Sequence, residues 1–468
     1  MKIGTPEDLR GLAEAYREKD ATLYIVGGAV RDALLNLNNS DVDITGRLLQ
    51  EEVLSLCGKL DIPCVPMSTR LGTLHIKING TVYEYTPFRT ERYAEGGEHR
   101  PSEVVFGVTL EEDARRRDFT VNAMYADALT GEIVDPLNGL ADLEKRQLRC
   151  CCDDTLESDA LRILRLIRFS GQLSFGIEPE TMEQAKKNVT LLEDIVPERR
   201  WEELTKILLC DRKYEGEYGA TDGYGLPVLP DSESGTLYGC LNTLFETGAI
   251  HYLFPELEQG FGMEQRSDYH AYTVLEHGLH ACACSYPDLT MRLAGLLHDI
   301  GKPSCKERDG NNYMHMQDGA EIADGELIAL KSPAKIRKDA VFIIRNHMYD
   351  IQGTAKIKTL RKKFAEWGKE GVVQLILMRE ADIRGSGTRP DYVAESWREL
   401  FHTMLHDGTP FSVSELDVTG KELMERAGIP EGVNVGAVLY ELYRHCINSP
   451  GDNKKDVLIR LAKQTGRR

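Results

Sequence analysis

One segment near the start of the chain constrains its fold more than any other: Leu23 to Thr45, LYIVGGAVRDALLNLNNSDVDIT. Its first four residues, 23–26, are apolar and strand-forming. The run ends at Gly27 and Gly28, which lack a Cβ atom and let backbone amides approach a ligand closely. Residues 29–37 then predict a short helix that begins on these glycines, with its first amides facing the same ligand. The segment therefore predicts a strand, a glycine turn and a helix suited to holding phosphate.

A second strand is predicted after this helix, and it carries Asp41 and Asp43. Positions i and i+2 of a strand point to the same face, so the two carboxylates would project side by side. Adjacent carboxylates repel unless a cation neutralises them, and Mg²⁺ prefers oxygen ligands. Singly, a Gly-Gly pair is usually a turn, and an Asp-x-Asp pair is usually a solvated turn or a cap. Together, in one strand–turn–helix–strand unit, they favour an enzyme that handles a nucleoside triphosphate.

The same stretch resembles the first motif of the class II tRNA nucleotidyltransferases, the CCA-adding enzymes and their bacterial poly(A) polymerase relatives. The resemblance implies an α+β multidomain protein: a small mixed or antiparallel sheet of the polymerase-beta type with helices, followed by an all-helical neck and body. It also implies that Asp41 and Asp43 are catalytic carboxylates that hold Mg²⁺. Gly27, Gly28 and Arg31 would position the triphosphate.

Composition and charge narrow the class of protein. At 468 residues the chain has room for roughly two to four domains. No run approaches the roughly eighteen apolar residues of a membrane helix, and the first residues lack the apolar core of a signal peptide. Eleven cysteines, an odd number without zinc-type spacing, predict reduced thiols in the cytoplasm. A net charge of −18 favours a selective RNA substrate over indiscriminate coating of nucleic acid.

The rest of the head is predicted to contain two further helices and a hairpin, at residues 5–19, 51–59, 72–78 and 81–88. The hairpin turns at Asn79–Gly80, a strong signal for this motif. Its second strand carries Glu84, which is either a third metal-side carboxylate or a partly exposed strand residue. Residues 90–102 are polar and predict a mobile loop.

A second chemical cluster is RRRDFTVNAM, residues 115–124. On composition alone, consecutive arginines beside an aspartate indicate a solvated helix end. A triphosphate, however, needs several fixed cations, and arginine binds phosphate in a bidentate manner. The run is similar to the second family motif, which implies that Arg117 contacts the phosphates, Asp118 contacts the ribose hydroxyls and Asn122 supports the site. Residues 135–142, DPLNGLAD, resemble the next motif and are interpreted as mainly structural.

Residues 158–169, SDALRILRLIRF, predict an amphipathic helix with an arginine face made by Arg162, Arg165 and Arg168. Without the resemblance, this segment is a surface helix with scattered charge. Its similarity to the base-reading motif of the family implies contact with the nucleotide. Asp159 and Arg162 stand at i and i+3 and are therefore predicted to share one helical face.

The chemistry of Asp159 and Arg162 suits cytosine and adenine. An aspartate accepts from an amino group and an arginine donates to a ring acceptor, and both bases present this pair on their pairing edge. Uracil and guanine present a carbonyl beside a ring N–H, and each mismatch costs about 1–3 kcal/mol by analogy with duplex readout. The pair would select C and A without a template. The sequence departs from the family in one place, because Ser158 stands where a glutamate is usual and Glu157 lies one place earlier.

Three segments complete the first half of the chain. Residues 197–209, PERRWEELTKILL, resemble the last neck motif and predict a helix that buttresses the base-reading helix. In this helix Arg199 is either structural or in contact with RNA phosphate. Residues 211–239 are rich in Gly, Tyr and Asp, depart from the usual family spacing and predict an insertion or long loop without an assigned function. Residues 240–257 return to a helical pattern typical of core packing.

A separate constellation lies farther along the chain, where four histidines in successive helical segments accompany a His-Asp doublet and a late aspartate: His277, His298, Asp299, His315, His347 and Asp382. Mixed imidazole and carboxylate ligands suit a transition metal better than Mg²⁺. The pattern resembles the HD phosphohydrolase superfamily, which implies metal ligation by His277, His298, Asp299 and Asp382. His315 and His347 would serve a second metal or substrate phosphate. The site either hydrolyses phosphate esters or cyclic phosphates on RNA ends, or is retained as a tRNA-binding body.

The predicted organisation has five parts: a catalytic head (1–150), a helical neck (151–210), a helical body with the insertion (211–260), an HD domain (261–400) and a helical tail (401–468). The tail is modestly basic and either contacts the body of a tRNA or is solvated. The predicted partners are ATP, CTP and the 3′ end and acceptor or elbow region of tRNA, with no membrane.

The predicted function is addition of CCA to tRNA without a nucleic acid template, with release of pyrophosphate. A poly(A) polymerase or an A-adding enzyme shares the motifs and is the first alternative. In the second alternative the head is a degenerate tRNA-binding module and the HD site is the working enzyme, a metal-dependent phosphohydrolase. The intact Asp41, Asp43, Asp159 and Arg162 count against it.

Overall fold

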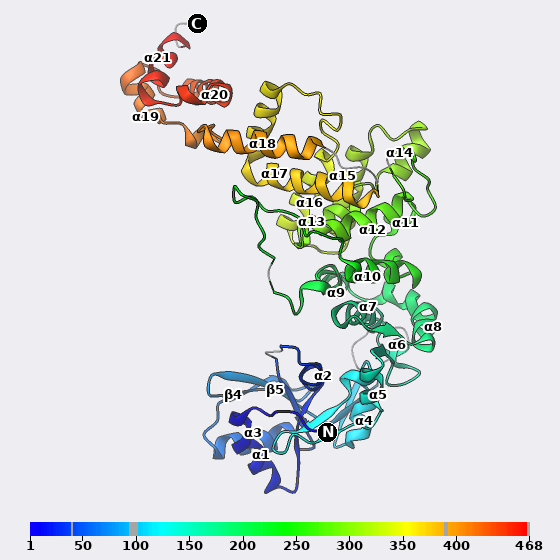
Figure 1. Ribbon diagram of the computed structural model, residues 1–468. Helices are drawn as coiled ribbons and strands as arrows, with labels where there is room; N and C mark the ends of the chain where they lie inside the picture. The colour runs from blue at the N-terminus through cyan, green and yellow to red at the C-terminus, as the bar shows by residue number, and fades with distance from the viewer. Residues whose placement is uncertain (39–40, 93–101, 217, 269, 388–391, 466–468) are drawn as a thin grey trace. The chain divides into compact units, whose positions relative to one another are not determined.

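The computed structural model describes residues 1–38, 41–92, 102–216, 218–268, 270–387 and 392–465, which form two compact units (Figure 1). The first unit contains residues 1–217, 235–255 and 329–331, and the second contains residues 218–234, 256–328 and 332–468. A mixed sheet in the first unit and helices elsewhere confirm the predicted α+β class. The five-part division remains a prediction, and its body segment contributes residues to both units.

The main sheet of the first unit has the order β3-β4-β5-β2-β1-β8-β9 within the described residues. Its strands are β1 (Leu23–Val26), β2 (Asp43–Gly46), β3 (Cys64–Ser68), β4 (Thr73–Ile78), β5 (Thr81–Pro87), β8 (Tyr125–Asp127) and β9 (Ile133–Val134). β2 and β5 run parallel and pair Asp43 with Glu84, whereas the other neighbours are antiparallel. The predicted β4–β5 hairpin is confirmed, and it turns at Asn79 and Gly80, which both have positive φ.

Two short sheets and several helices complete the first unit. The short sheets pair β6 (Arg89–Arg92) with β7 (Glu103–Phe106), and β10 (Gln147–Leu148) with β11 (Gly176–Ile177). The α-helices are α1 (Arg10–Arg17), α2 (Gly28–Leu34), α3 (Gln50–Lys59), α4 (Leu110–Arg115), α5 (Gly139–Glu144), α6 (Thr155–Ser158), α7 (Leu161–Leu173), α8 (Pro179–Asn188), α9 (Pro197–Leu208) and α10 (Gly235–Glu246). Single helical turns are η1 (Glu7–Leu9), η2 (Thr120–Asn122), η3 (Val189–Asp194), η4 (Cys210–Arg212) and η5 (Ala249–Tyr252).

The predicted strand and loop in the head differ from the structure. β2 begins at Asp43, so Asp41 precedes the strand that was predicted to carry it. The physical reason is the partner strand: Val26 pairs with Asp43, and the chain then leaves the sheet at Gly27, where φ is +74°. The loop predicted over residues 90–102 begins as strand β6, and most of it lies outside the described residues.

The predicted helix over residues 158–169 is broken at its start. Asp159 lies between α6 and α7 with extended backbone (φ −144°, ψ 97°), so Asp159 and Arg162 do not share a face of one helix. Asp159 Oδ1 accepts a hydrogen bond from the backbone N–H of Leu161 at 3.1 Å. Aspartate favours this local bond to the backbone over continuing a helix, which explains the break.

The regular elements of the second unit are helices within its described residues, apart from an isolated β-bridge between Thr221 and Pro227, and α12, α13, α16, α17 and α18 pack together in it (Figure 1). Its helices are α11 (Pro255–Glu258), α12 (Val274–Cys284), α13 (Leu289–Leu297), α14 (Lys302–Asp309), α15 (His315–Ala329), α16 (Ala334–Asn346), α17 (Ile357–Gly385), α18 (Tyr392–His406), α19 (Gly420–Glu422), α20 (Val433–Asn448) and α21 (Lys455–Thr465), with short turns η6 (Val413–Glu415), η7 (Leu423–Ala427) and η8 (Pro450–Asp452). In the described part of the chain, no helix combines the length and the apolar character needed to cross a membrane.

Residues 218–234, from the predicted insertion, are anchored to the second unit by their own side chains. Asp222 accepts from Arg398 at 2.9 Å, and Arg398 also pairs with Glu380 at 2.9 Å. Glu233 lies 2.8 Å from His280 of α12. The segment is therefore a fixed strap on the helical unit and not only a surface loop.

Candidate functional site

A cavity of about 710 Å³ in the first unit gathers the residues that the sequence predicts for the nucleotide and its metal. All twelve line it: Gly27, Gly28, Arg31, Asp41, Asp43, Arg117, Asp118, Asn122, Asp159, Arg162, Arg165 and Arg168. They come from the β1–α2 segment, from β2 and the residues just before it, from the segment after α4, and from α7 and the residues just before it, which are far apart in the sequence. The fold therefore concentrates carboxylates and arginines in a space of the size that small-molecule sites have.

The carboxylate side of this cavity has the electrostatics of a cation site. Asp43 begins β2 beside Glu84 of β5, and Asp41 lies two residues before it. Burial, together with the negative charges of Glu84 and Asp41, raises the pKa of Asp43, and Arg117 opposes this shift. A divalent cation would relieve this repulsion, and carboxylate oxygens are the ligands that hard cations prefer. The residues present therefore fit a divalent metal ion.

The backbone conformation at position 27 requires a glycine. Its φ is +74°, which side chains with a Cβ atom rarely adopt, and an added Cβ atom would lie 3.7 Å from Arg117 Nη1. The glycine turn thus brings the β1–α2 segment close to Arg117. The predicted strand–turn–helix is confirmed, with α2 beginning at Gly28.

Asp113 forms ion pairs with Arg116 and Arg117 at the edge of the cavity, and the sequence analysis did not identify it. Asp113 is fully buried; its Oδ2 accepts from Arg117 Nη2 at 3.0 Å and from Tyr125 Oη at 2.7 Å. Its Oδ1 lies 2.7 Å from Arg116 Nη2. Burial alone would raise the pKa of Asp113, but Arg117 and Arg116 hold that pKa well below its usual value. The spacing of Asp113, three and four residues before these arginines, was the available signal.

Replacement of Asp113 by alanine is expected to destabilise the protein by about 3–5 kcal/mol, because it removes the buried carboxylate that pairs with Arg117 and leaves Arg116 with Glu91 alone. Urea unfolding of the full chain, followed by the fluorescence of its aromatic side chains, measures this loss. Replacing Asp153 with alanine is the control, since Asp153 is exposed and should change stability by less than about 0.5 kcal/mol. Equal stability of the two variants would contradict the role given to Asp113.

The arginine face of α7 lies on the cavity, and each of its arginines is held by hydrogen bonds or an ion pair within the protein. Arg165 donates to Asp118 Oδ2, with its Nη2 at 2.5 Å, and Arg168 Nε lies 2.9 Å from Glu203 Oε2. Burial opposes ionisation of Asp118, but Arg165 and its other donors hold the pKa of Asp118 well below its usual value. Arg162 donates to the backbone carbonyls of Thr155 at 3.1 Å and of Arg116 at 2.7 Å. These contacts hold each guanidinium group in one orientation.

Sequence reasoning also missed an aromatic ring beneath these arginines and two residues beside Arg31. The guanidinium carbons of Arg31, Arg165 and Arg168 lie 5.2, 5.4 and 4.4 Å from the centre of the Phe169 ring. Asp32 and Tyr214 contact Arg31 and line the same cavity. Nothing in the local pattern around Tyr214 indicates this contact, because 183 residues separate it from Arg31.

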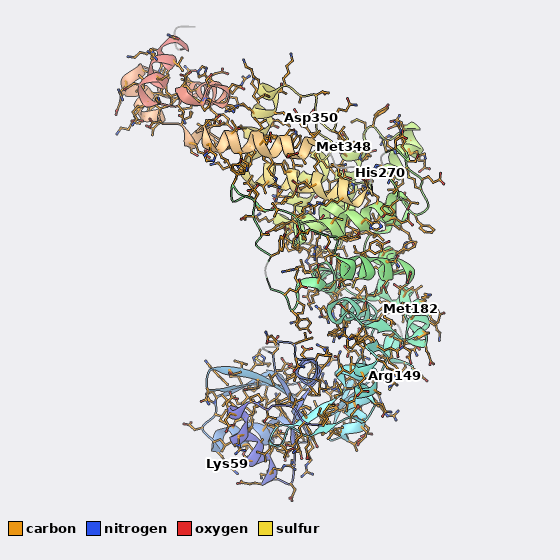
Figure 2. All side chains as sticks on the ribbon, viewed as in Figure 1. Lys59, Arg149, Met182, His270, Met348 and Asp350 are labelled. Carbon is orange, nitrogen blue, oxygen red and sulfur yellow. The ribbon has the colours of Figure 1, made fainter. Side chains whose placement is uncertain are left out.

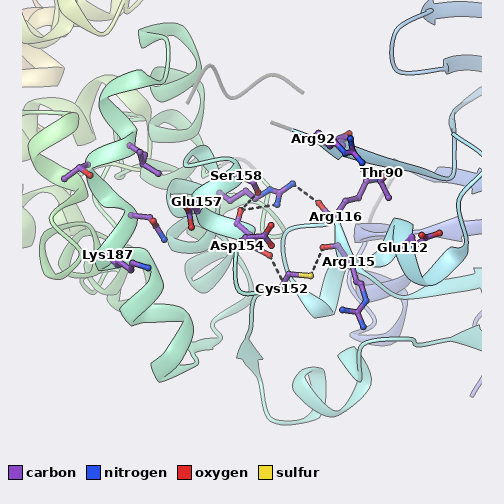
Figure 3. A pocket seen from close by; sticks show the side chains of 16 residues that line it. Thr90, Arg92, Glu112, Arg115, Arg116, Cys152, Asp154, Glu157, Ser158 and Lys187 are labelled. Atoms are coloured by element: carbon purple, nitrogen blue, oxygen red, sulfur yellow. Dashed lines mark hydrogen bonds and ion pairs between the residues drawn. The ribbon is translucent and has the colours of Figure 1, made fainter. Parts of the chain in front are cut away.

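Figure 3 shows the lining residues of a second cavity, which has a volume of about 980 Å³. The two cavities share Glu91, Arg116 and Arg162 as lining residues. Figure 3 shows Arg115, Arg116 and Glu112 on one side and Asp154, Glu157 and Lys187 on the other. The molecule therefore offers two neighbouring spaces separated by a few charged side chains.

The predicted histidine and aspartate cluster assembles in the second unit as two triads. His277 of α12, His298 after α13 and Asp382 of α17 form the first: His277 Nε2 lies 3.0 Å from His298 Nε2 and 2.9 Å from Asp382 Oδ1. Asp299, His315 and His347 form the second. Within each triad, the atoms that could bind a metal lie within 4.8 Å of one another.

Asp299 belongs to the second triad and also faces the first, so that each of its carboxylate oxygens points to a different pair of histidines. Its Oδ2 lies 3.3 Å from His298 Nε2 and 3.7 Å from His277 Nε2. Its Oδ1 lies 3.3 Å from His315 Nε2 and 4.0 Å from His347 Nε2. A carboxylate placed in this way can bridge two metal ions.

The hydrogen bonds behind the rings support metal ligation. His315 Nδ1 lies 2.6 Å from the carbonyl of Asn312, and His347 Nδ1 lies 2.6 Å from the carbonyl of Ile344. A carbonyl only accepts, so each Nδ1 carries a hydrogen, and the two Nε2 atoms face one another at 3.2 Å. Burial and the neighbouring histidines lower the pKa of His347 to about 3, so that this ring stays neutral. With each Nδ1–H held by a backbone carbonyl, the two Nε2 atoms are oriented as ligands for one metal ion.

Two further side chains border this metal cluster. Lys302 Nζ lies 2.5 Å from Asp299 Oδ2 and 2.6 Å from Gln265 Oε1. His270, labelled in Figure 2, packs edge-on against His277 with 4.6 Å between ring centroids. Burial lowers the pKa of His270 to about 4, so this ring is neutral at pH 7.

Comparison with known proteins agrees with this arrangement. Three family models match: the Poly A polymerase head domain over residues 23–149, the probable RNA and SrmB-binding site of polymerase A over 174–216, and the HD domain over 268–384. A crystal structure of the Bacillus stearothermophilus CCA-adding enzyme in complex with CTP matches 98% of this chain and 97% of that chain, with a TM-score of 0.64 and 24% identity. The fold and the cavity thus define a nucleotidyltransferase head joined to an HD domain.

Two curated relatives define the family more closely. The CCA-adding enzyme of Streptococcus pneumoniae serotype 19F is 40% identical over 251 residues, 53% of this chain and 60% of that protein. The A-adding tRNA nucleotidyltransferase of Deinococcus radiodurans is 30% identical over 437 residues, 89% of this chain and 90% of that protein. The chain belongs to the class II tRNA nucleotidyltransferase family. Both its head and its HD domain imply the use of divalent metal ions.

Proposed function

We propose that this protein adds CCA to the 3′ end of tRNA from CTP and ATP, without a nucleic acid template. The observation that carries the proposal is the single cavity lined by all twelve residues predicted for the nucleotide and its metal. The streptococcal relative that is named a CCA-adding enzyme supports it, and the matching region includes 60% of that protein. Reduced cysteines fit a cytoplasmic location, since all eleven are free thiols.

In this proposal the residues of the cavity divide the work of nucleotidyl transfer. Mg²⁺ bound by Asp41 and Asp43 would supply the charge that activates the RNA 3′-hydroxyl and stabilises the departing pyrophosphate. Arg117, held by Asp113, presents a fixed cation to the triphosphate. Asp118, fixed by Arg165 and Asn122, accepts hydrogen bonds from the ribose hydroxyls. The adjoining cavity gives the RNA 3′ end a place beside the nucleotide.

Base selection is assigned to Asp159 and Arg162. Two of the five N–H groups of Arg162 are bound by backbone carbonyls, which fix the plane of the guanidinium group and leave its other donors for a base. The Asp159 carboxylate lies 3.9 Å from Arg199 Nη2 and lines the same cavity. A fixed donor and a fixed acceptor together match the pairing edges of cytosine and adenine.

Replacing Asp159 with asparagine exchanges one acceptor oxygen for a donor. We expect kcat/KM for CTP and for ATP to fall about 10- to 100-fold, with a relative gain for UTP, because a mismatched base contact costs about 1–3 kcal/mol. Steady-state incorporation of each single nucleotide measures the change. Replacing the exposed Asp153 with asparagine is the control, and an unchanged preference in the Asp159 variant would remove this residue from base selection.

The test of the proposed function is incubation of the protein with Mg²⁺, tRNA lacking its last three nucleotides, and each nucleoside triphosphate singly and together. Addition of two C residues, then one A and a stop, is the expected result. A single A, added only to tRNA that already ends in CC, would instead make this an A-adding enzyme, the activity named for the Deinococcus relative. A long A tail would indicate a poly(A) polymerase.

A second candidate function belongs to the HD site, and the bridging position of Asp299 favours it. We propose metal-dependent hydrolysis of phosphate esters or cyclic phosphates on RNA ends. Two metal ions held by the two triads would supply a hydroxide nucleophile at neutral pH. The imidazole-rich ligand set fits a transition metal. Lys302, whose Nζ lies 2.5 Å from Asp299 Oδ2, places a positive charge beside the proposed metal ligands, which would favour a phosphate substrate there.

A further inference from the structure

A buried ion pair of Arg31 and Asp32 lies against the nucleotide cavity. Both residues belong to α2 and are 4% and 1% exposed. Arg31 Nε donates to Asp32 Oδ1 at 2.8 Å, and Arg31 Nη2 lies 2.6 Å from the same oxygen. Arg31 Nη1 donates to Asn122 Oδ1 at 2.5 Å. The edge of the guanidinium group that arginine uses to bind phosphate in a bidentate manner is therefore occupied by Asp32.

Tyr214, which follows η4, covers this ion pair from a distant part of the chain. Its Oη lies 3.2 and 3.3 Å from the two carboxylate oxygens of Asp32 and 3.3 Å from Arg31 Nη2. A carboxylate only accepts, so the hydroxyl donates to Asp32 and accepts from Arg31. Burial raises the pKa of Tyr214, so that the hydroxyl keeps its hydrogen at neutral pH.

The contacts continue from Arg31 into the predicted ribose site. Asn122 Nδ2 donates to Asp118 Oδ1 at 3.0 Å, and Arg165 Nη2 donates to Asp118 Oδ2 at 2.5 Å. The result is one continuous series of hydrogen-bonded side chains along the cavity: Tyr214, Asp32, Arg31, Asn122, Asp118 and Arg165.

We infer that Tyr214 is a positioning residue for the incoming nucleotide. Four of the five N–H groups of Arg31 are engaged by Asp32, Asn122 and Tyr214, so Arg31 acts on the site mainly through Asn122. Tyr214 sets the orientation of Arg31, and Asn122 passes this orientation on to Asp118. This inference rests on the proposed nucleotide-binding role of the cavity, and it adds a residue that the sequence analysis did not assign to the site.

The test is replacement of Tyr214 with phenylalanine, which removes the hydroxyl and keeps the ring. We expect KM for both CTP and ATP to rise about tenfold while kcat changes less than about threefold, because the variant loses a hydrogen bond that orients the nucleotide site and keeps the carboxylates proposed to hold the metal. Replacing Tyr224 with phenylalanine is the matched control, since Tyr224 is 68% exposed. The thermal midpoint of the Tyr214 variant should stay within about 2 °C of the parent protein, which separates positioning from folding.

Binding of CTP in the presence of Ca²⁺, measured by calorimetry without turnover, distinguishes failure of the inference on Tyr214 from failure of the proposed function. If the parent protein binds and incorporates CTP while the Tyr214 variant shows unchanged KM and unchanged CTP affinity, the inference on Tyr214 is wrong and the proposed function stands. If the parent protein neither binds nor incorporates CTP, the proposed function fails, and the inference fails with it. A large drop in thermal midpoint with unchanged KM would assign Tyr214 to folding alone.

Discussion

Replacement of Asp43 by alanine is expected to lower nucleotide addition by at least about a thousandfold, a loss of roughly 4 kcal/mol of transition-state stabilisation. Asp43 stands at the start of β2, beside Glu84 and close to Asp41, where burial and then the neighbouring negative charges raise the pKa of its carboxyl group. The alanine variant loses a ligand for the ion that this crowding favours. Single-turnover addition of C to tRNA lacking its last three nucleotides measures the effect.

Binding of tRNA provides the comparison for this variant. Removal of one carboxylate from the head should leave the affinity for tRNA within about threefold, since RNA affinity depends mainly on cationic contacts to phosphates. The Asp41 variant should behave like the Asp43 variant, and alanine at the exposed Asp153 should retain full activity. Incorporation that survives in both the Asp41 and Asp43 variants would exclude these residues as the metal ligands.

Replacement of Asp299 by alanine is expected to remove both metal ions from the HD site, because this carboxylate faces both triads. The parent protein, purified with Mn²⁺ or Fe²⁺, should carry about two ions per chain at this site, measured by elemental analysis. Alanine at His347 should leave about one ion, since it takes a ligand from one triad only. Hydrolysis of bis(p-nitrophenyl) phosphate should fall below about 1% of the parent rate in the Asp299 variant.

Two control measurements accompany the Asp299 variant. Nucleotide addition should be unchanged in the Asp299 variant, since the residues proposed for it lie in the first unit. Alanine at His406, an exposed histidine of α18 outside the triads, should preserve the metal content. An Asp299 variant that keeps about two ions per chain would disprove the bridging position, and a parent protein that holds metal without hydrolysis would favour a purely structural HD domain.

Local sequence patterns predicted the structure correctly where interactions between neighbouring residues determine the conformation. The Gly27–Gly28 turn, the Asn79–Gly80 hairpin and the α+β class are all confirmed. Each depends on neighbouring residues: glycine permits positive φ, and alternating or helical periodicity sets which face is buried. The same local evidence predicted too long a strand at Asp41 and an unbroken helix through Asp159.

Only the tertiary structure decided which side chains meet. Strand β2 begins where its partner β1 leaves the sheet, and that pairing places Asp41 before the strand. The partners of Arg31 are separated from it by up to 183 residues, and Asp299 faces four histidines on separate helical segments. The sequence by itself determined the residue types and their local conformations, because turns and helices form between near neighbours. Their assembly into a nucleotide cavity and two facing triads depends on packing between distant segments, which no local pattern contains.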